Sequence, residues 1–461
     1  MIGEPTDDGR RMSERAEPAD AGVGVDALDG LPPASGRVGR YRWVICALLF
    51  FAITINYVDR QVVGILKPLL EQEFGWSEND YANIVFAFSA AYALGLLVVG
   101  RMMDALGTRR GMGVAVTVWS LAAVAHAAAS GVGGFVAARL ALGLGEAGGF
   151  PGAIKAVSEW FPKRERAFAT GLFNAGANVG ALVTPILVPI LVLAWGWQAA
   201  FIITGASGFV LLATWLWVYR RPQEHRRVGA AELAYIESDP VDQPGRISWG
   251  VALRRREAWA FILGKFLTDP VWWLFLFWLP DFFAKTHGLT LLPSGGSIFV
   301  TFGPALVAVY LLADVGSIGG GWLSSFLIRR GWSINAARKT TMLICALCVT
   351  PVSIAAFVDS LAVAIAIIGV AAAAHQGWSA NLFTLTSDLF PRRAVATIVG
   401  LGGFAGAIGG MFIAKFAGWT LEATGSYVPL LLFAGVTYLI TLGIIHLLTP
   451  RMEPVSLPAE A

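Results

Sequence analysis

An acid and a base stand side by side inside an otherwise apolar segment of this chain. Asp59 and Arg60 follow Asn56 and Tyr57 within the stretch 43–66. At about 1.5 Å per residue, this stretch is long enough to cross a bilayer. A charged side chain in a membrane costs about 2.5–3.5 kcal/mol on insertion scales, and it normally faces a protein interior or a water-filled cavity. Both charges are therefore candidates for a functional site.

A second acid that could do chemistry is Glu146, in the segment 134–157. Arg139 lies near the outer end of this segment, and Glu146 follows seven residues later. That spacing places Glu146 on roughly the same helix face and about 10 Å deeper. A carboxyl group near the middle of the membrane can carry a proton. The alternative is a static glutamate whose hydrogen bonds hold helices together. Gly143 and Gly145 beside it would let another helix approach closely.

Segment 259–284 combines charge with aromatic rings. Lys265 and Asp269 are four residues apart, and Trp272 and Trp273 follow. Lys265 could bind an anionic substrate while the tryptophan rings stack on a sugar face. The alternative is a structural ion pair with ordinary aromatic packing, because residues at this spacing are neighbours on a helix.

Segment 361–387 is too polar for a helix that faces lipid. Its hydrogen-bonding side chains are His375, Gln376, Trp378, Ser379, Asn381 and Thr384. Gln376 and Asn381 can bind hydroxyl groups, as a polyol substrate requires. A polar seam between helices is the alternative, and a lone histidine such as His375 more often serves as a fixed hydrogen-bond donor.

Twelve apolar segments of membrane-crossing length position these side chains. They span 43–66, 81–103, 111–130, 134–157, 168–193, 198–219, 259–284, 298–328, 338–358, 361–387, 394–418 and 427–449. The chain is 56% hydrophobic, and its 14% of charged residues lies well below the roughly 25% of a soluble domain. The sequence therefore predicts an all-α membrane protein with twelve transmembrane helices.

A polar stretch rich in Arg, Glu and Pro divides the segments into two groups of six. We predict one six-helix bundle over 42–220, a cytoplasmic linker over 221–258 and a second bundle over 259–450. Residues 1–41 contain no apolar core and are expected to form a disordered cytoplasmic tail. Residues 451–461 form a second cytoplasmic tail.

Positive charge predicts the orientation of the helices. Alternate loops carry Arg109 and Arg110; Lys163, Arg164 and Arg166; Arg220, Arg221, Arg226 and Arg227; Arg254 to Arg256; Arg329, Arg330, Arg338 and Lys339; and Arg392 and Arg393. The opposite loops hold little beyond Lys67 and Lys285. The basic loops and both termini are therefore expected to be cytoplasmic.

The two groups of helices are related in sequence. The pattern from Gly100 to Arg110 recurs 220 residues later as Gly320 to Arg330, and 158–164 recurs 229 residues later. Paired repeats of six helices are typical of transporters that rock two bundles about a central site. Under the second shift Glu146 aligns with His375, and we expect both to face the interface between the bundles.

The loop after the second segment resembles the signature cytoplasmic loop of the major facilitator superfamily. Its Asp104, Arg109 and Arg110 could form a breakable charge pair that latches the two halves in one state. Stretches 56–60, 143–151 and 158–162 resemble the anion:cation symporter branch of that superfamily. Stretches 265–273, 277–280 and 375–391 resemble its bacterial hexuronate transporters.

This resemblance implies two pseudo-symmetric six-helix bundles and proton-coupled uptake of a sugar acid. In that branch the arginine matching Arg60 holds the substrate carboxylate, and the acids matching Asp59 and Glu146 carry the coupling protons. Tyr57 and Tyr92 match tyrosines near the substrate. The residues that would read the hydroxyl groups are Trp378, Ser379 and Asn381. A guanidinium group suits this role because it binds a planar carboxylate through two hydrogen bonds.

Two points stay open at this stage. Arg60 could be released by protonation of Asp59 directly, or the coupling could run by way of Glu146. Ser324 occupies the position that matches Asp104, so the latch is expected to be one-sided.

The leading interpretation is a proton symporter that imports hexuronates, galacturonate or glucuronate, across the bacterial inner membrane by alternating access. Another organic anion, such as an aldonate, aldarate or dicarboxylate, is the alternative, followed by a non-transporting membrane sensor. An enzyme is disfavoured because the five histidines are scattered and no HExxH pattern occurs. We expect no cofactor, no metal and no nucleic-acid partner, and a monomer in the bilayer.

Overall fold

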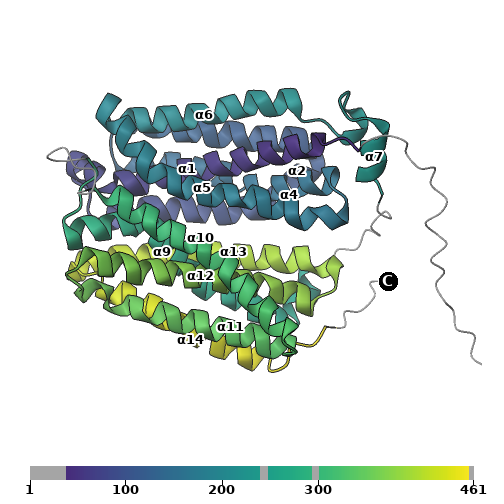
Figure 1. Cartoon of the computed structure of the whole chain (residues 1–461). Coiled ribbons are helices and arrows are strands. Elements are labelled where there is room, and N and C mark those ends of the chain that lie inside the picture. The colour runs from purple at the N-terminus through teal and green to yellow at the C-terminus, as the bar shows by residue number, and fades with distance from the viewer. Residues whose placement is uncertain (1–37, 239–247, 293–300, 456–461) are drawn as a thin grey trace, which may run out of the picture.

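Helices make up nearly all of the computed structural model, which describes residues 38–238, 248–292 and 301–455. The helices of the first bundle are α1 (Tyr41–Phe74), α2 (Glu78–Ala125), α3 (Val132–Glu146), α4 (Gly149–Trp160), α5 (Lys163–Trp195) and α6 (Trp197–Val218). Those of the second are α9 (Arg256–His287), α10 (Phe302–Arg329), α11 (Ile334–Val349), α12 (Leu361–Leu389), α13 (Arg392–Thr424) and α14 (Val428–Leu448). The two bundles lie side by side (Figure 1). The predicted all-α fold in two six-helix halves is confirmed.

Eleven helical segments in the described part of the chain are long and apolar enough to cross a membrane. Two of them belong to α2, because Gly107 interrupts that helix with φ 74° and ψ 159°, a backbone conformation that favours glycine. The remaining predicted crossing, 134–157, is divided between α3 and α4, which are each too short to be counted alone. The first residues of the predicted segment 298–328 and most of the predicted tail 1–41 fall outside the described residues.

The break between α3 and α4 follows directly after Glu146. Ala147 and Gly148 separate the two helices. Pro151 has no backbone N–H with which to bond the carbonyl of Ala147, four residues earlier, so the helix ladder is interrupted at this level. The candidate acid therefore stands at a helix end in the interior of the bundle.

The bundles approach each other most closely near the turn that joins α1 to α2, which we call the α1–α2 end. A Cβ atom added to Gly418 of α13 would lie 2.3 Å from the Cβ of Ala82 in α2. A Cβ added to Gly303 of α10 would lie 2.8 Å from the carbonyl oxygen of Pro185 in α5. Glycine at these positions allows backbone contact between the two halves.

Two short helices, α7 (Ala230–Ile236) and α8 (Trp249–Leu253), lie in the predicted linker. In Figure 1, α7 sits beyond the right-hand end of the first bundle. Arg42 at the start of α1 joins it there: its backbone N–H donates to the carboxylate of Glu232 at 3.1 Å, and its guanidinium lies 4.7 Å from the ring of Tyr235. The linker helix is thus fastened to the end of the first bundle that is opposite the α1–α2 end.

Candidate functional site

Arg60 and Glu146 form a buried ion pair between α1 and the end of α3. The Arg60 Nε donates to Glu146 Oε2 at 2.8 Å, and Arg60 Nη2 donates to Asn56 Oδ1 at 3.1 Å. The two charged side chains are 5% and 0% exposed. The other carboxylate oxygen of Glu146 has no hydrogen-bond partner among the described residues. The structure thus joins two of the predicted site residues directly.

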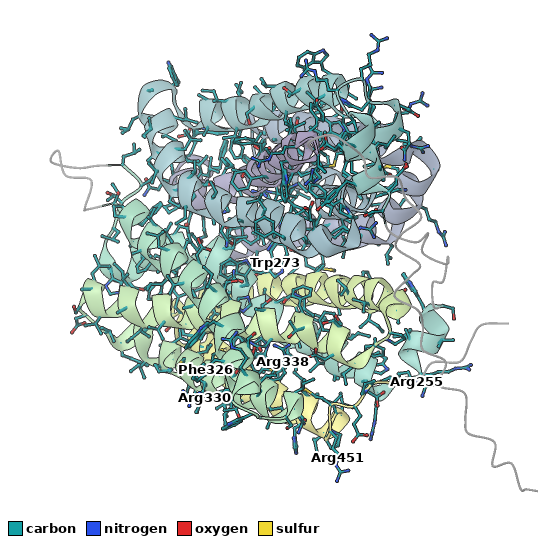
Figure 2. The ribbon with its side chains drawn as sticks, turned by 45° about the vertical axis from the view of Figure 1, so that its right-hand side comes forward. Arg255, Trp273, Phe326, Arg330, Arg338 and Arg451 are labelled. Atoms are coloured by element: carbon teal, nitrogen blue, oxygen red, sulfur yellow. The ribbon has the colours of Figure 1, made fainter. Side chains whose placement is uncertain are left out.

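Four aromatic rings surround the Arg60 guanidinium. Its central carbon lies 4.7 Å from the ring centroid of Tyr57, 5.3 Å from Phe88, 5.0 Å from Tyr92 and 5.5 Å from Trp273. Such rings attract a cation electrostatically. Trp273 belongs to α9, so the cage is closed by the opposite bundle, and Figure 2 shows this residue at the boundary between the two halves. The sequence placed Tyr57, Tyr92 and Trp273 near the substrate, and all three contact the same guanidinium.

Asp59 lies apart from Arg60, inside the first bundle. Both of its carboxyl oxygens are buried without a hydrogen-bond partner among the described residues. Its polar neighbours are the hydroxyl of Thr204 in α6 and the charged groups of Arg139 and Glu146. The direct Asp59–Arg60 pair that the sequence allowed is not formed. Glu146 takes that place because consecutive residues on a helix point about 100° apart.

Arg139 supports the site from α3. Its Nη1 donates to the backbone carbonyl of Arg60 at 3.0 Å, while its Nε and Nη2 have no partner among the described residues. The side chain is fully buried. This bond joins α3 to α1 at the level of Arg60.

Lys265 forms the structural ion pair with Asp269 that the sequence analysis gave as the alternative to a substrate contact. Its Nζ lies 2.7 Å from Asp269 Oδ2 and 4.6 Å from the ring centroid of Phe383, within the second bundle. The ion pair neutralises both charges. The structure thus contains this ion pair, and a substrate role for Lys265 stays a prediction.

The polar residues of α12 also serve mainly within the second bundle. Asn381 Nδ2 donates to the carbonyls of Gly320 and Gly377 at 3.0 and 2.9 Å, which makes a polar seam with α10. Trp378 is fully buried, with its ring 5.3 Å from that of Tyr438. The seam, which the sequence left as the alternative, is what the structure contains. Gln376 and Ser379 are partly exposed, and their roles stay predictions.

His375 does not face the interface between the bundles, contrary to the expectation from its alignment with Glu146. Its ring stacks on Trp272 at 5.2 Å, and its Nδ1 is hydrogen-bonded to the Tyr438 hydroxyl. Both partners belong to the second bundle. Trp272 therefore packs against His375 and is not one of the four rings around the Arg60 guanidinium.

The predicted gating loop is held mainly to its own bundle. The Arg109 guanidinium donates to the Leu216 carbonyl, and the Arg109 carbonyl accepts from Trp215 Nε1 at 3.0 Å. Arg110 is exposed. The side chain of Asp104 lies outside the described part of the structure, so the predicted latch stays a prediction.

The sequence analysis did not assign a role to Glu159 or Asp388, the acids at matching positions of the repeated pattern 158–164. Glu159 accepts from the hydroxyls of Thr108 at 2.5 Å and Tyr219 at 2.6 Å. In the second bundle Asp388 accepts from Arg338 Nε at 3.0 Å, and the same arginine donates to Ser324 at 2.8 Å. The signal was present, because an acid follows the serine in both copies.

A charge cluster at the α1–α2 end was also missed. We call Lys67, Glu71, Glu78, Asp281 and Lys285 the Lys67 cluster. The fully buried Lys67 Nζ lies 2.7 Å from Asp281, 3.1 Å from Glu71 and 3.2 Å from Glu78. Lys285 pairs with Glu78 and lies 3.2 Å from Asp281. The cluster joins α1 and α2 to α9 of the second bundle.

The three carboxylates of the Lys67 cluster have oxygens within 4.8 Å of one another, close enough to share a metal ion. The two lysine ammonium groups already stand between them. The arrangement is therefore that of an ion-pair network and not of a metal site.

One further acid lies within the membrane-crossing part of α10. The Asp314 carboxylate lies near the Asn178 amide of α5, so polar groups of the two bundles approach each other here as well. A lone acid in the apolar segment 298–328 is a signal that the sequence already contained.

Comparisons with known proteins agree with this architecture. The Major Facilitator Superfamily matches residues 49–414. The hexuronate transporter of Escherichia coli (strain K12) is 34% identical over 397 residues, which cover 84% of this chain and 90% of that protein. The D-galactonate transporter of Escherichia coli O6:H1 is 29% identical over 425 residues, which cover 89% and 96%.

Solved structures show the same fold. The crystal structure of a bacterial homologue of the human lysosomal transporter Spinster, in an inward-facing and occupied conformation, superposes with a TM-score of 0.66 at 19% identity, and the match covers 90% of this chain and 98% of that one. The chain belongs to the Major Facilitator Superfamily and is a multi-pass membrane transporter, not an enzyme.

Proposed function

We propose that this transporter imports a hexuronate, galacturonate or glucuronate, together with protons. The observation that carries the proposal is the Arg60 guanidinium, which is buried among four aromatic rings from both bundles and paired with the carboxylate of Glu146. A guanidinium that already holds a protein carboxylate is suited to hold a substrate carboxylate in the same way. A hexuronate transporter among the relatives supports this substrate class.

Coupling follows from competition for Arg60. While Glu146 is ionised, it occupies the Nε donor of the guanidinium. When Glu146 binds a proton it loses its charge, and the guanidinium becomes available to the substrate carboxylate. Proton uptake by Glu146 and substrate binding to Arg60 therefore favour each other, which is the thermodynamic requirement of a symporter.

Asp59 is the second proton carrier in this proposal. It is buried within the first bundle next to Thr204, with Arg139 and Glu146 nearby. Because Asp59 does not hold Arg60, it acts on the substrate by way of Glu146. A charge on one acid disfavours a charge on the other, so the two protonation steps are linked.

The aromatic cage forms the substrate-binding surface in this proposal. Tyr57, Tyr92 and Trp273 contact the guanidinium that would hold the carboxylate, so their rings and hydroxyls would also border the sugar. Gln376 and Ser379 remain predicted substrate contacts, whereas Lys265 and Asn381 are engaged elsewhere.

We further propose a bacterial inner-membrane location, with both termini in the cytoplasm and a single copy as the working unit. The basic loops support this orientation, because positively charged loops stay on the cytoplasmic side. The α1–α2 end would then face outward, and the close bundle contacts there describe a state that is closed on that side.

Uptake into energised membrane vesicles tests the proposal. Labelled galacturonate and glucuronate should accumulate when a proton gradient is imposed, and an uncoupler should abolish the accumulation. Unlabelled galactonate and glucarate are the competitors, because an aldonate or aldarate carries the same carboxylate for Arg60, and a D-galactonate transporter is also among the relatives. Failure of both uronates to accumulate under a proton gradient would overturn the proposed substrate and leave the fold assignment unchanged.

A further inference from the structure

We propose that Gln61 is a specificity-determining residue, whose amide binds a hydroxyl group of the substrate beside the carboxylate held by Arg60. This inference rests on the proposed transport of a sugar acid. It adds a residue of α1 to the recognition of the substrate hydroxyl groups, which the sequence had assigned to residues of α12.

The Gln61 amide is buried, and no described residue hydrogen-bonds to it. The residue is 1% exposed, and both Oε1 and Nε2 are unsatisfied among the described residues. Leaving a buried donor and acceptor unpaired is unfavourable, so native proteins normally pair them. Both atoms are therefore available to a ligand.

Helix periodicity places Gln61 where the two bundles meet. Tyr57, Gln61 and Gly64 are spaced i, i+4 and i+7, so they share one face of α1. At one end of this face, the Cβ of Tyr57 packs against Gly180 of α5. At the other end, a Cβ on Gly64 would lie 3.4 Å from the carbonyl oxygen of Leu276 in α9. Gln61 lies between these contacts.

Contacts between the bundles also show where Gln61 lies along the axis of α1. One turn closer to the α1–α2 end, Gly64 touches the backbone of α9, and the Tyr81 hydroxyl donates to the Phe277 carbonyl at 2.8 Å. These contacts join the two bundles between Gln61 and the α1–α2 end. Tyr57 shares the helix face of Gln61, and its ring centroid lies 4.7 Å from the Arg60 guanidinium, so this face borders the group that would hold the substrate carboxylate. A hydroxyl group of a sugar acid lies a few bonds from its carboxylate, so one substrate can reach both side chains.

An amide suits this role because it offers a donor and an acceptor, which is what a hydroxyl group uses. Two other buried amides are partly or fully engaged. Asn381 bonds two carbonyls of the α10–α12 seam, and the amide of Asn56 is half engaged, because its oxygen accepts from Arg60 while its Nδ2 has no hydrogen-bond partner among the described residues. Gln61 is the buried amide near Arg60 whose donor and acceptor are both free in the described part of the structure.

The test is transport by Gln61→Met, which keeps the side-chain length and removes the polar atoms. Uptake of galacturonate is compared with uptake of its mono-deoxy analogues, each lacking one hydroxyl group. We expect the KM for galacturonate to rise about tenfold, as for loss of one hydrogen bond. For one analogue, wild type and variant should have nearly the same KM, because the partner hydroxyl is already missing.

Thr441→Val is the matched control, since this buried hydroxyl in α14 bonds only within its own helix, to the Thr437 carbonyl at 2.7 Å. Gln61→Asn is the milder variant and should alter the same analogue pattern if Gln61→Met fails to reach the membrane. An equal loss for every analogue, or an unchanged KM, would contradict the role of Gln61. No uptake of any uronate by the wild type would instead contradict the proposed substrate.

Discussion

At the scale of single residues, the proposed mechanism is a competition between two carboxylates, that of Glu146 and that of the substrate, for the Arg60 guanidinium. Arg60 is buried and already satisfied by Glu146 and Asn56, and a substrate must displace Glu146 to use the same donor. Displacing an ionised carboxylate from a buried cation is costly, because the freed charge would be left uncompensated. A proton on Glu146 would remove that cost, which is the physical basis of the proposed symport.

Glu146→Gln imitates the protonated acid and tests this competition. We expect the variant to bind and exchange galacturonate but to lose accumulation driven by a proton gradient. Wild-type binding should strengthen as the pH falls, because protonation of Glu146 frees Arg60. In the variant this pH dependence should weaken. Equilibrium binding across pH and counterflow in proteoliposomes measure both effects, and gradient-driven accumulation at the wild-type level would disprove the coupling role.

Asp59→Asn separates the second acid from the first. Because Asp59 does not contact Arg60, we expect exchange of substrate across the membrane to persist while gradient-driven accumulation is lost. Comparison of exchange with uptake in the same proteoliposomes gives the result. Thr214→Val in α6 removes a partly exposed hydroxyl that donates to the Val210 carbonyl at 2.8 Å, and it serves as the control. Loss of exchange together with accumulation would place Asp59 in substrate binding.

The sequence predicted which residues belong to this site, but it did not predict which of them contact one another. Arg60, Glu146, Tyr57 and Tyr92 stand out because charge or a phenol in an apolar segment is rare. Which acid pairs with Arg60 depends on the rotation of α1 against α3, and no local pattern encodes that angle. Gln61 was overlooked because its importance lies in unsatisfied atoms, which only a packed structure reveals.

At the scale of helices, close packing through glycine decides what the polar residues of α12 can do. A Cβ added to Gly320 would lie 2.3 Å from the Cα of Gly377, so α10 and α12 are in backbone contact there. That contact brings the Gly320 carbonyl within reach of the Asn381 amide. The polar sequence of α12 resembled a substrate-binding surface, because a polar contact between helices and a substrate-binding site are built from the same types of side chain.

Gly320→Ala tests the seam, and Gly319→Ala is its matched control one residue away. Nothing lies within 4 Å of a Cβ added to Gly319, so alanine there should be neutral. At Gly320 the same methyl group must push two helices apart, and overpacking of this kind costs about 1–3 kcal/mol. We expect the melting temperature of the purified protein in detergent to fall for the first variant only. Equal melting temperatures would contradict the packing.

At the scale of the whole molecule, the order of helices and their division into two halves were predictable, because both follow from hydropathy and repeats. Contacts between the halves were not. Lys67 and Asp281 are 214 residues apart and belong to no shared pattern, yet their charged atoms are 2.7 Å apart. The sequence assigned Lys67 and Lys285 to outer loops, whereas both lie on helices within the Lys67 cluster.

The Lys67 cluster should act as a lock at the α1–α2 end. Opening that end must separate Lys67 from Asp281, and the tight approach of Gly418 to Ala82 must be lost at the same time. Lys67→Met removes the buried cation and leaves Lys285 as the remaining cation of the cluster, so that repulsion among its three carboxylates grows. We expect the variant to populate states open at this end more than the wild type does.

Spin labels at the exposed positions Glu73 and Ala423 would report that opening, because they lie on opposite bundles near the same end. Their distance distribution in nanodiscs should gain a longer component in Lys67→Met. Asp388→Asn is the control, since its partner Arg338 lies within the same bundle and its loss does not unlock the halves. An unchanged distribution in Lys67→Met would show that glycine packing alone keeps this end closed, because the charges would then contribute nothing to the balance between states.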